Sequence, residues 1–309
     1  MRVNTVVERS EDKRGHWLLD IGVITTVIVV LIGVYLFPAS IQRALVFEYT
    51  EPTLLTAYTA HFVHFSVRHF IGNLTAFVLV SGTVYVISVE ANRRRAFVKI
   101  CATILIAFPI ALSMLNLSIP RNSITYGFSG MNMAFVGFLP IVLTTYIERQ
   151  WRYSLDTKIL LLAFVLSVSY IAAVVLPNER FFGITVWIAL VVALGILTVS
   201  FLLHAISERP ANASRSRRVT RMSRFERIAS NGPAAIPLVF GTALWVLFLS
   251  IGFTTPDATT GTVTNVYTHF LGYALGFITA YLAYEWRLFD EQPVRTATCS
   301  REKAQSDAN

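Results

Sequence analysis

Long apolar runs of about 20 residues repeat along this 309-residue chain and limit its fold more than any other feature. A helix needs roughly 20 apolar residues to cross the ~30 Å hydrocarbon core of a bilayer. Within lipid the backbone finds no water to bond, so each run must satisfy its own polar groups as an α-helix. We therefore predict an all-α polytopic membrane protein with about eight transmembrane helices. They are expected at residues 17–38, 62–88, 96–116, 127–147, 156–177, 182–204, 234–253 and 265–285.

The distribution of basic residues predicts which side of the membrane each connection occupies. Of the 26 Lys and Arg residues, 22 lie in the two tails and in alternate connections, and the other four are Arg43, Arg68, Arg121 and Arg180. Basic residues concentrate on the cytoplasmic side of membrane proteins. Both termini are therefore predicted to be cytoplasmic in a multi-pass protein of the cell membrane. This asymmetry also accounts for the net charge of +8 without a nucleic-acid partner.

The chain divides into a membrane domain and two short tails. We expect a cytoplasmic N-terminal tail at 1–16, a transmembrane domain at 17–286 and a cytoplasmic C-terminal tail at 287–309. A cytoplasmic Arg-rich loop at 205–232 interrupts the transmembrane domain. Clustered arginines next to a membrane attract anionic lipid headgroups, so membrane lipids are the expected partner of this loop.

Three polar clusters that are distant in sequence are predicted to share one depth in the membrane. The second expected helix runs inward from the outer face, with His61, His64 and His69 in its outer part. The fourth and eighth helices run the same way, which places Ser129 and His269 near their outer ends. Polar side chains inside a membrane are costly and indicate function by default. The shared depth therefore predicts a site that opens toward the outer face.

The stretch around Ser129 also has a purely structural interpretation. Gly127, Gly130, Ala134 and Gly137 form a stripe of small residues at helical spacing. Such a stripe permits close helix approach with or without chemistry. The local sequence GFSG also differs from the GxSxG turn of soluble hydrolases, and no strand precedes it. Alone, this stretch favours packing.

The last expected helix offers a partner for Ser129. His269, Gly272 and Gly276 lie on one face of that helix. If its glycines meet the small-residue stripe, His269 comes near Ser129. A histidine in that place would accept the hydroxyl proton and so activate a weak nucleophile.

The second expected helix offers hydrogen-bond donors. His69 and Asn73 are four residues apart and face the same way. With the backbone N–H of Ser129 they would suit the oxyanion of an acyl-transfer intermediate. The alternative is a buried polar network that only holds helices together. A metal site is disfavoured, because His64 and His69 are expected on different helix faces and no carboxylate lies deep in any span. That lack also argues against a two-aspartate protease and leaves His269 without an acidic partner.

Three short motifs occur in a familiar order: HFSVRHFIGN, then GFSG, then HFLGYALG. Together they resemble the motifs of the rhomboid intramembrane serine proteases, over the second, third, fourth and eighth helices and, by position, the first. The resemblance implies a rhomboid-like bundle and a serine endopeptidase, a hydrolase that uses a Ser–His dyad and no cofactor or metal. Its substrates would be transmembrane segments of membrane proteins. The implied roles are Ser129 as nucleophile, His269 as general base, His69 and Asn73 as oxyanion donors, and His64, Gly127, Gly130, Met133, Gly272 and Gly276 as structural residues near the site.

The chain departs from this family in three places. The simplest members have a six-helix core with one helix between the serine and histidine helices, whereas three are expected here. The two extra helices preserve the direction of the last helix, and 234–253 is favoured as the lateral gate. Met133 stands where the family often carries an aromatic residue, although a thioether can also pack on an imidazole. Leu55 and Thr56 stand near the place of the family's external Trp–Arg pair.

Two other functions remain open from the sequence. Met133 and the extra helices also fit a catalytically inactive rhomboid-like protein that binds or escorts membrane proteins. Eight helices with a polar cluster near one face would permit a transporter. The sequence shows no repeated halves, no matching pair of broken helices and no deep acidic residue for ion coupling, which disfavours transport.

Overall fold

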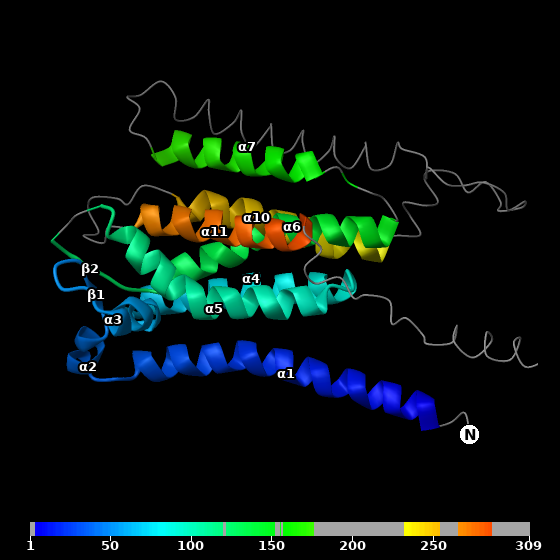
Figure 1. Cartoon of the computed structure of the whole chain (residues 1–309), viewed down its shortest axis with the longest axis horizontal. Coiled ribbons are helices and arrows are strands. Elements are labelled where there is room, and N and C mark those ends of the chain that lie inside the picture. Colours follow the sequence, from blue (N-terminus) through cyan, green and yellow to red (C-terminus); the bar gives the residue numbers. More distant parts are fainter. Residues whose placement is uncertain are drawn as a thin grey trace, which may run out of the picture.

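The computed structural model describes residues 4–119, 122–151, 155, 157–175, 232–253 and 265–285. These residues are mostly helical (Figure 1). The expected helix at 182–204, the C-terminal tail and the Arg-rich loop up to residue 231 lie outside them. The helices are α1 (Asn4–Tyr35), α2 (Ala39–Ala44), α3 (Leu54–Thr59), the 3₁₀ helix η1 (Ala60–Phe62), α4 (Val67–Glu90), α5 (Arg94–Asn116), α6 (Ser129–Trp151), α7 (Thr157–Val175), α10 (Gly232–Gly252) and α11 (Val266–Glu285), and the strands are β1 (Phe47–Glu48) and β2 (Ile124–Thr125).

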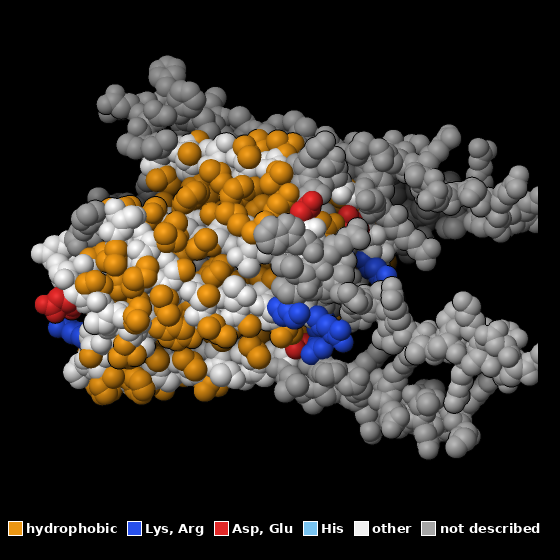
Figure 2. All heavy atoms as spheres, viewed as in Figure 1, with side chains coloured by type: hydrophobic (Ala, Val, Ile, Leu, Met, Phe, Trp, Pro, Cys, Tyr) orange, Lys and Arg blue, Asp and Glu red, His pale blue; other side chains and the backbone are white. Residues whose placement is uncertain are grey.

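Five of these helices are long and apolar enough to cross a membrane, namely α4, α5, α6, α10 and α11. The described apolar parts of α1 and α7 are shorter, at Asp20–Tyr35 and Ile159–Val175. Figure 2 shows hydrophobic side chains over the middle of the bundle and Lys and Arg side chains mainly toward one end. The chain is therefore an integral membrane protein of the all-α class, as predicted.

The segment between α1 and α4 is folded, and this shortens the second expected helix. That helix begins at Val67 rather than at residue 62, because the Ser66 side chain caps it by accepting a hydrogen bond from the His69 N–H at 3.2 Å. Before it lie α2, β1, α3 and η1, and β1 pairs antiparallel with β2. His61 and His64 therefore precede α4, whereas the sequence prediction placed them inside it.

The segment between α1 and α4 is fastened to α5 at a proline. Pro109 has no N–H, so it leaves the carbonyl of Leu105 without its helical donor. The Tyr58 hydroxyl donates to that carbonyl at 3.1 Å. The His61 Nε2–H donates to the carbonyl of Pro109 at 2.9 Å and lies 3.1 Å from Ser113 Oγ. The irregular part of α5 thus holds α3 and η1 in place.

A buried ion pair joins α1 to α5 near the opposite end of the bundle. Asp20 is 4% exposed, and Arg94 donates to both of its carboxylate oxygens, from Nη2 at 2.8 Å and from Nε. The sequence prediction did not anticipate a buried carboxylate in a span. Asp20 lies at the start of the apolar part of α1 and is neutralised by its partner.

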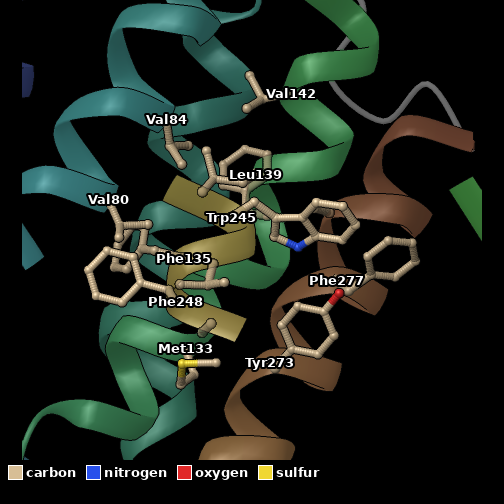
Figure 3. Close-up of a cluster of buried hydrophobic side chains, with 14 of the residues drawn as sticks. Val80, Val84, Met133, Phe135, Leu139, Val142, Trp245, Phe248, Tyr273 and Phe277 are labelled. Atoms are coloured by element: carbon tan, nitrogen blue, oxygen red, sulfur yellow. The ribbon is translucent and has the colours of Figure 1, made fainter. Parts of the chain in front are cut away.

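Helix α6 occupies the centre of the bundle. Its entire apolar window is buried, and it packs on α4, α10 and α11, most extensively on α11. Figure 3 shows the shared core, in which Trp245 and Phe248 of α10 and Tyr273 and Phe277 of α11 surround side chains of α6. Met133 lies at one end of this cluster.

The stripes of small residues on α6 and α11 meet, as predicted. A Cβ on Gly276 would lie 2.6 Å from the Cα of Ala134, and one on Gly272 would lie 2.9 Å from the carbonyl carbon of Gly130. A Cβ on Gly137 would lie 2.8 Å from the N of Phe277. In lipid, helices associate through such van der Waals contact rather than through the hydrophobic effect.

Replacing Gly276 with alanine tests this packing. The added methyl group would collide with the Ala134 backbone, which cannot move aside as a side chain can. We expect Gly276→Ala to destabilise the protein by about 1–3 kcal/mol or more and to lower the melting temperature in detergent. Gly82→Ala is the matched control, since a Cβ there meets nothing within 4 Å. Equal melting temperatures for the two variants would contradict the close contact.

Candidate active site

Ser129 is the first residue of α6 and is half-buried. Gly127, two residues earlier, has φ +109°, a conformation that favours glycine. The ring of His69 lies 2.7 Å from where a Cβ on Gly127 would stand, so a side chain has no room there either. The first N–H groups of a helix lack acceptors within the helix and carry partial positive charge. The backbone N–H of Ser129 is one of these groups, so an anion next to it would be stabilised.

His64 holds the backbone just before Ser129. Its Nδ1–H donates to the carbonyl of Phe62 at 3.2 Å, and its Nε2 accepts from the N–H of Phe128 at 3.4 Å. The pKa of His64 is lowered to about 4, mainly by burial and also by the nearby His69, while the hydrogen bond to Phe62 opposes both. His64 is therefore neutral at neutral pH, which keeps Nε2 free to accept.

The rings of His64 and His69 contact each other, with centroids 4.9 Å apart. The sequence prediction that they lie on different faces of one helix is wrong, because only His69 belongs to α4. Among the described residues the ring nitrogens of His69 make no hydrogen bond, so they are available to a ligand.

A residue that the sequence prediction did not single out, Asn132, supports Asn73. The Asn132 amide donates to the backbone carbonyl of Asn73 at 3.0 Å and to its Oδ1 at 3.2 Å. Asn73 Nδ2 in turn donates to the carbonyl of His69 at 3.1 Å. An amide carries two N–H groups, and the second N–H of Asn73 has no acceptor in the described part of the chain. The sequence did carry one indication of this role, namely a polar asparagine within an apolar helix, one turn after Ser129.

His269, on α11, is 8% exposed and has a defined tautomer. Its Nδ1 lies 2.6 Å from the carbonyl oxygen of Gly252, at the end of α10. A carbonyl can only accept, so Nδ1 carries the proton and Nε2 keeps its lone pair. The Phe253 ring packs edge-on against the imidazole, with centroids 6.3 Å apart. This is the tautomer that a general base acting through Nε2 requires.

A second polar network, also missed in the sequence, fixes the start of α11. Asn265 caps the helix by accepting from the N–H of Thr268 at 3.2 Å, and its Nδ2 lies 3.2 Å from Asn116 Oδ1. Asn116 Nδ2 also donates to Thr268 Oγ1 at 2.8 Å. The beginning of α11 is thus tied to the end of α5, one residue away from His269.

The residues around Ser129 contact His69, Asn73 and the residue that precedes His269. Gly127 contacts His69, and Asn132 contacts Asn73. A Cβ on Gly130 would lie 2.7 Å from Cγ2 of Thr268, the residue before His269. The sites predicted on α4, α6 and α11 therefore converge at one end of the bundle.

No hydrogen bond joins the Ser129 side chain to the His269 ring within the described residues. Those residues also contain no group of three or more His, Cys, Asp or Glu placed to hold a metal ion. No family model, curated protein or solved structure matches the chain. What the site can do is inferred from its geometry and its motifs.

The buried histidine His61 predicts acid sensitivity. Burial lowers its pKa from 6.5 to about 4, against the opposing hydrogen bonds to the backbone of Pro109 and Gly127. Between pH 6.5 and 4 His61 binds a proton in the denatured chain but stays neutral in the native chain. The free energy of unfolding therefore decreases as pH falls through this window, by up to roughly 3 kcal/mol.

His64 contributes in the same window, so the wild-type melting temperature should fall from pH 7 to pH 5. His61→Gln keeps an N–H donor toward Pro109 without titrating, and we expect roughly half of the wild-type fall. Thermal unfolding in detergent at several pH values measures this. Parallel curves for the two proteins would show that His61 is not buried in its neutral form.

Proposed function

We propose that this chain is a rhomboid-type intramembrane serine endopeptidase that cleaves transmembrane segments of membrane-protein substrates. The observation that carries the proposal is the hydrogen bond from His269 to Gly252, which leaves Nε2 as an acceptor. His269 lies on the helix that packs against the start of α6 through Gly130 and Gly272. A serine at a helix N-terminus beside a histidine of this tautomer is suited to acyl transfer.

In the proposed reaction, Ser129 Oγ attacks the scissile carbonyl carbon while His269 Nε2 takes the hydroxyl proton. The resulting imidazolium passes that proton to the leaving amine as the C–N bond breaks. A water molecule then gives a proton to His269 Nε2 as its oxygen bonds to the acyl carbon. The bond from that carbon to Ser129 Oγ breaks, the imidazolium returns the proton to Oγ, and the acid product leaves. The backbone carbonyl of Gly252 holds the Nδ1–H throughout, in the place where other serine proteases use a carboxylate.

The oxyanion would be met by three donors: the backbone N–H of Ser129, the His69 ring and the second N–H of Asn73. Such donors act because they are held in place before the reaction. Asn132 fixes the amide of Asn73, and His64 fixes the backbone before Ser129. These supporting bonds hold the His69 ring and the second N–H of Asn73 beside the start of α6, and neither has an acceptor among the described residues.

The site would open to the outer face of the membrane. The starts of α4, α6 and α11 meet near Ser129, whereas the basic turn Arg93–Arg95 follows the far end of α4. Cytoplasmic placement of that basic turn puts Ser129 on the outer side, where water can enter. In this arrangement both termini are cytoplasmic, and α10 is the proposed lateral gate.

The second candidate function is an inactive rhomboid-like binding or escort protein. The lack of a Ser129–His269 hydrogen bond favours it. In unliganded enzymes, however, catalytic hydrogen bonds are often long and shorten only when substrate binds. The tautomer of His269 has no evident use in a binder, and this favours the protease.

Cleavage of a labelled transmembrane substrate by purified protein in detergent or liposomes tests the proposal. We expect Ser129→Ala to lower the rate by about three orders of magnitude or more, because the nucleophile is removed. Ser81→Ala is the matched control, since Ser81 is buried in α4 and, within the described residues, its hydroxyl bonds only to the carbonyl of Phe77. Equal cleavage by wild type and Ser129→Ala would refute the assignment.

A further inference from the structure

We propose that the C-terminal end of α10 is a positioning element of the site, with the backbone carbonyl of Gly252 setting the tautomer and orientation of His269. The inference rests on the proposed function for its catalytic meaning. It extends that function by making the base depend on the helix that is the proposed gate.

The first observation is the hydrogen bond itself. At 2.6 Å from Nδ1 to the carbonyl oxygen it is short for an N–H···O bond. It crosses from α10 to α11, between residues 17 positions apart. The last carbonyls of a helix have no donor within it, so the end of α10 offers a free acceptor with partial negative charge. No side chain is needed for this role.

The second observation is the packing that holds Gly252 in place. A Cβ on Gly252 would lie 3.0 Å from Sδ and 3.3 Å from Cε of Met133. Glycine at 252 therefore lets the end of α10 rest on Met133, one turn along α6 from Ser129. Met133 is itself 3% exposed.

The third observation is the aromatic contact to His269. It comes from Phe253, which directly follows Gly252 and is fully buried. The end of α10 thus supplies both the hydrogen-bond acceptor and the ring that confine the imidazole.

This arrangement makes the base sensitive to the position of α10. A shift of about 1 Å at Gly252 would stretch the 2.6 Å bond beyond the range of a hydrogen bond. Nδ1 would then lose its acceptor, and the tautomer with the proton on Nε2, which cannot act as a base toward Ser129, would become populated. Opening of α10 for substrate entry must therefore spare its C-terminal end or be reversed before catalysis.

The test is a pair of variants on the same helix. Gly252→Val places a branched side chain against Met133 and displaces the carbonyl. Gly241→Val is the matched control, because a Cβ at Gly241 would be equally crowded, at 2.9 Å from Ile87 Cδ1 and Leu143 Cδ2, but away from His269. The direct readout is the ¹⁵N chemical shifts of the imidazole of His269, assigned by their loss in His269→Gln. The second readout is the kinetics of transmembrane-substrate cleavage.

We expect wild type and Gly241→Val to show the tautomer with the proton on Nδ1. Gly252→Val should populate the Nε2–H tautomer, and its kcat should fall about 10- to 100-fold with little change in KM. An unchanged tautomer in Gly252→Val would overturn the inference. If wild type cleaves nothing but the tautomer responds in this way, the positioning role stands and the proposed protease function falls.

If Gly252→Val fails to fold, Met133→Ala replaces it, since it removes the support under Gly252 without crowding. Met131→Ala is then the control, as an equally buried methionine of α6 that does not approach Gly252. A tautomer that shifts in Met133→Ala and not in Met131→Ala supports the inference. The same tautomer in both variants contradicts it.

Discussion

The close approach of α6 and α11 is the constraint on which the rest of this structure depends. Gly130 and Ala134 on α6 face Gly272 and Gly276 on α11 so closely that a methyl group added to either α11 glycine would collide with the α6 backbone. A methyl group added to Gly137 would likewise collide with the backbone of Phe277. Lipid gives no hydrophobic drive for this contact, so it exists only because small residues let the helices touch. Its consequence is positional: the first turns of both helices, with Ser129 and His269, come to the same end of the bundle. Without that contact, Ser129 is an ordinary serine near the end of a membrane helix.

The histidines of the site show how environment divides one residue type into several roles. His61 and His64 use their ring nitrogens to hold backbone and side-chain groups of α5 and of the segment before Ser129, and burial keeps them neutral. His69 lies against Gly127 with ring nitrogens that make no hydrogen bond among the described residues. His269 binds a carbonyl through Nδ1 and keeps its other nitrogen as an acceptor. The first pair thus holds neighbouring parts of the chain in place, and the second pair keeps ring nitrogens that are not used in such bonds among the described residues.

Of the eight helices that the sequence predicted, five are described as long and apolar enough to cross a membrane, because that property depends on length and composition alone. The sequence also allowed for a meeting of the two small-residue stripes, because helical spacing places those residues on one face. It misplaced His61 and His64, since the cap at Ser66 makes α4 begin later than hydropathy suggests. It missed Asn132, because the role of this residue depends on its hydrogen bonds to Asn73 on another helix. It also missed the buried carboxylate of Asp20, because the ion pair with Arg94 that neutralises it joins two distant segments. The acceptor for His269 could not be predicted from the sequence, because every residue has a backbone carbonyl and no residue type marks the one that accepts. It took three-dimensional packing to bring Gly252 to the imidazole.

The central claim is that Ser129 is a nucleophile activated by His269. The most direct measurement is covalent labelling of purified protein with a fluorophosphonate, followed by mass spectrometry of the modified peptide. The account predicts one modification, on Ser129, that is abolished or slowed about a hundredfold or more in His269→Ala, because removal of the base leaves a weakly reactive hydroxyl. Labelling of Ser129 at the same rate in wild type and His269→Ala, or no labelling of Ser129 in the wild-type protein, would contradict it.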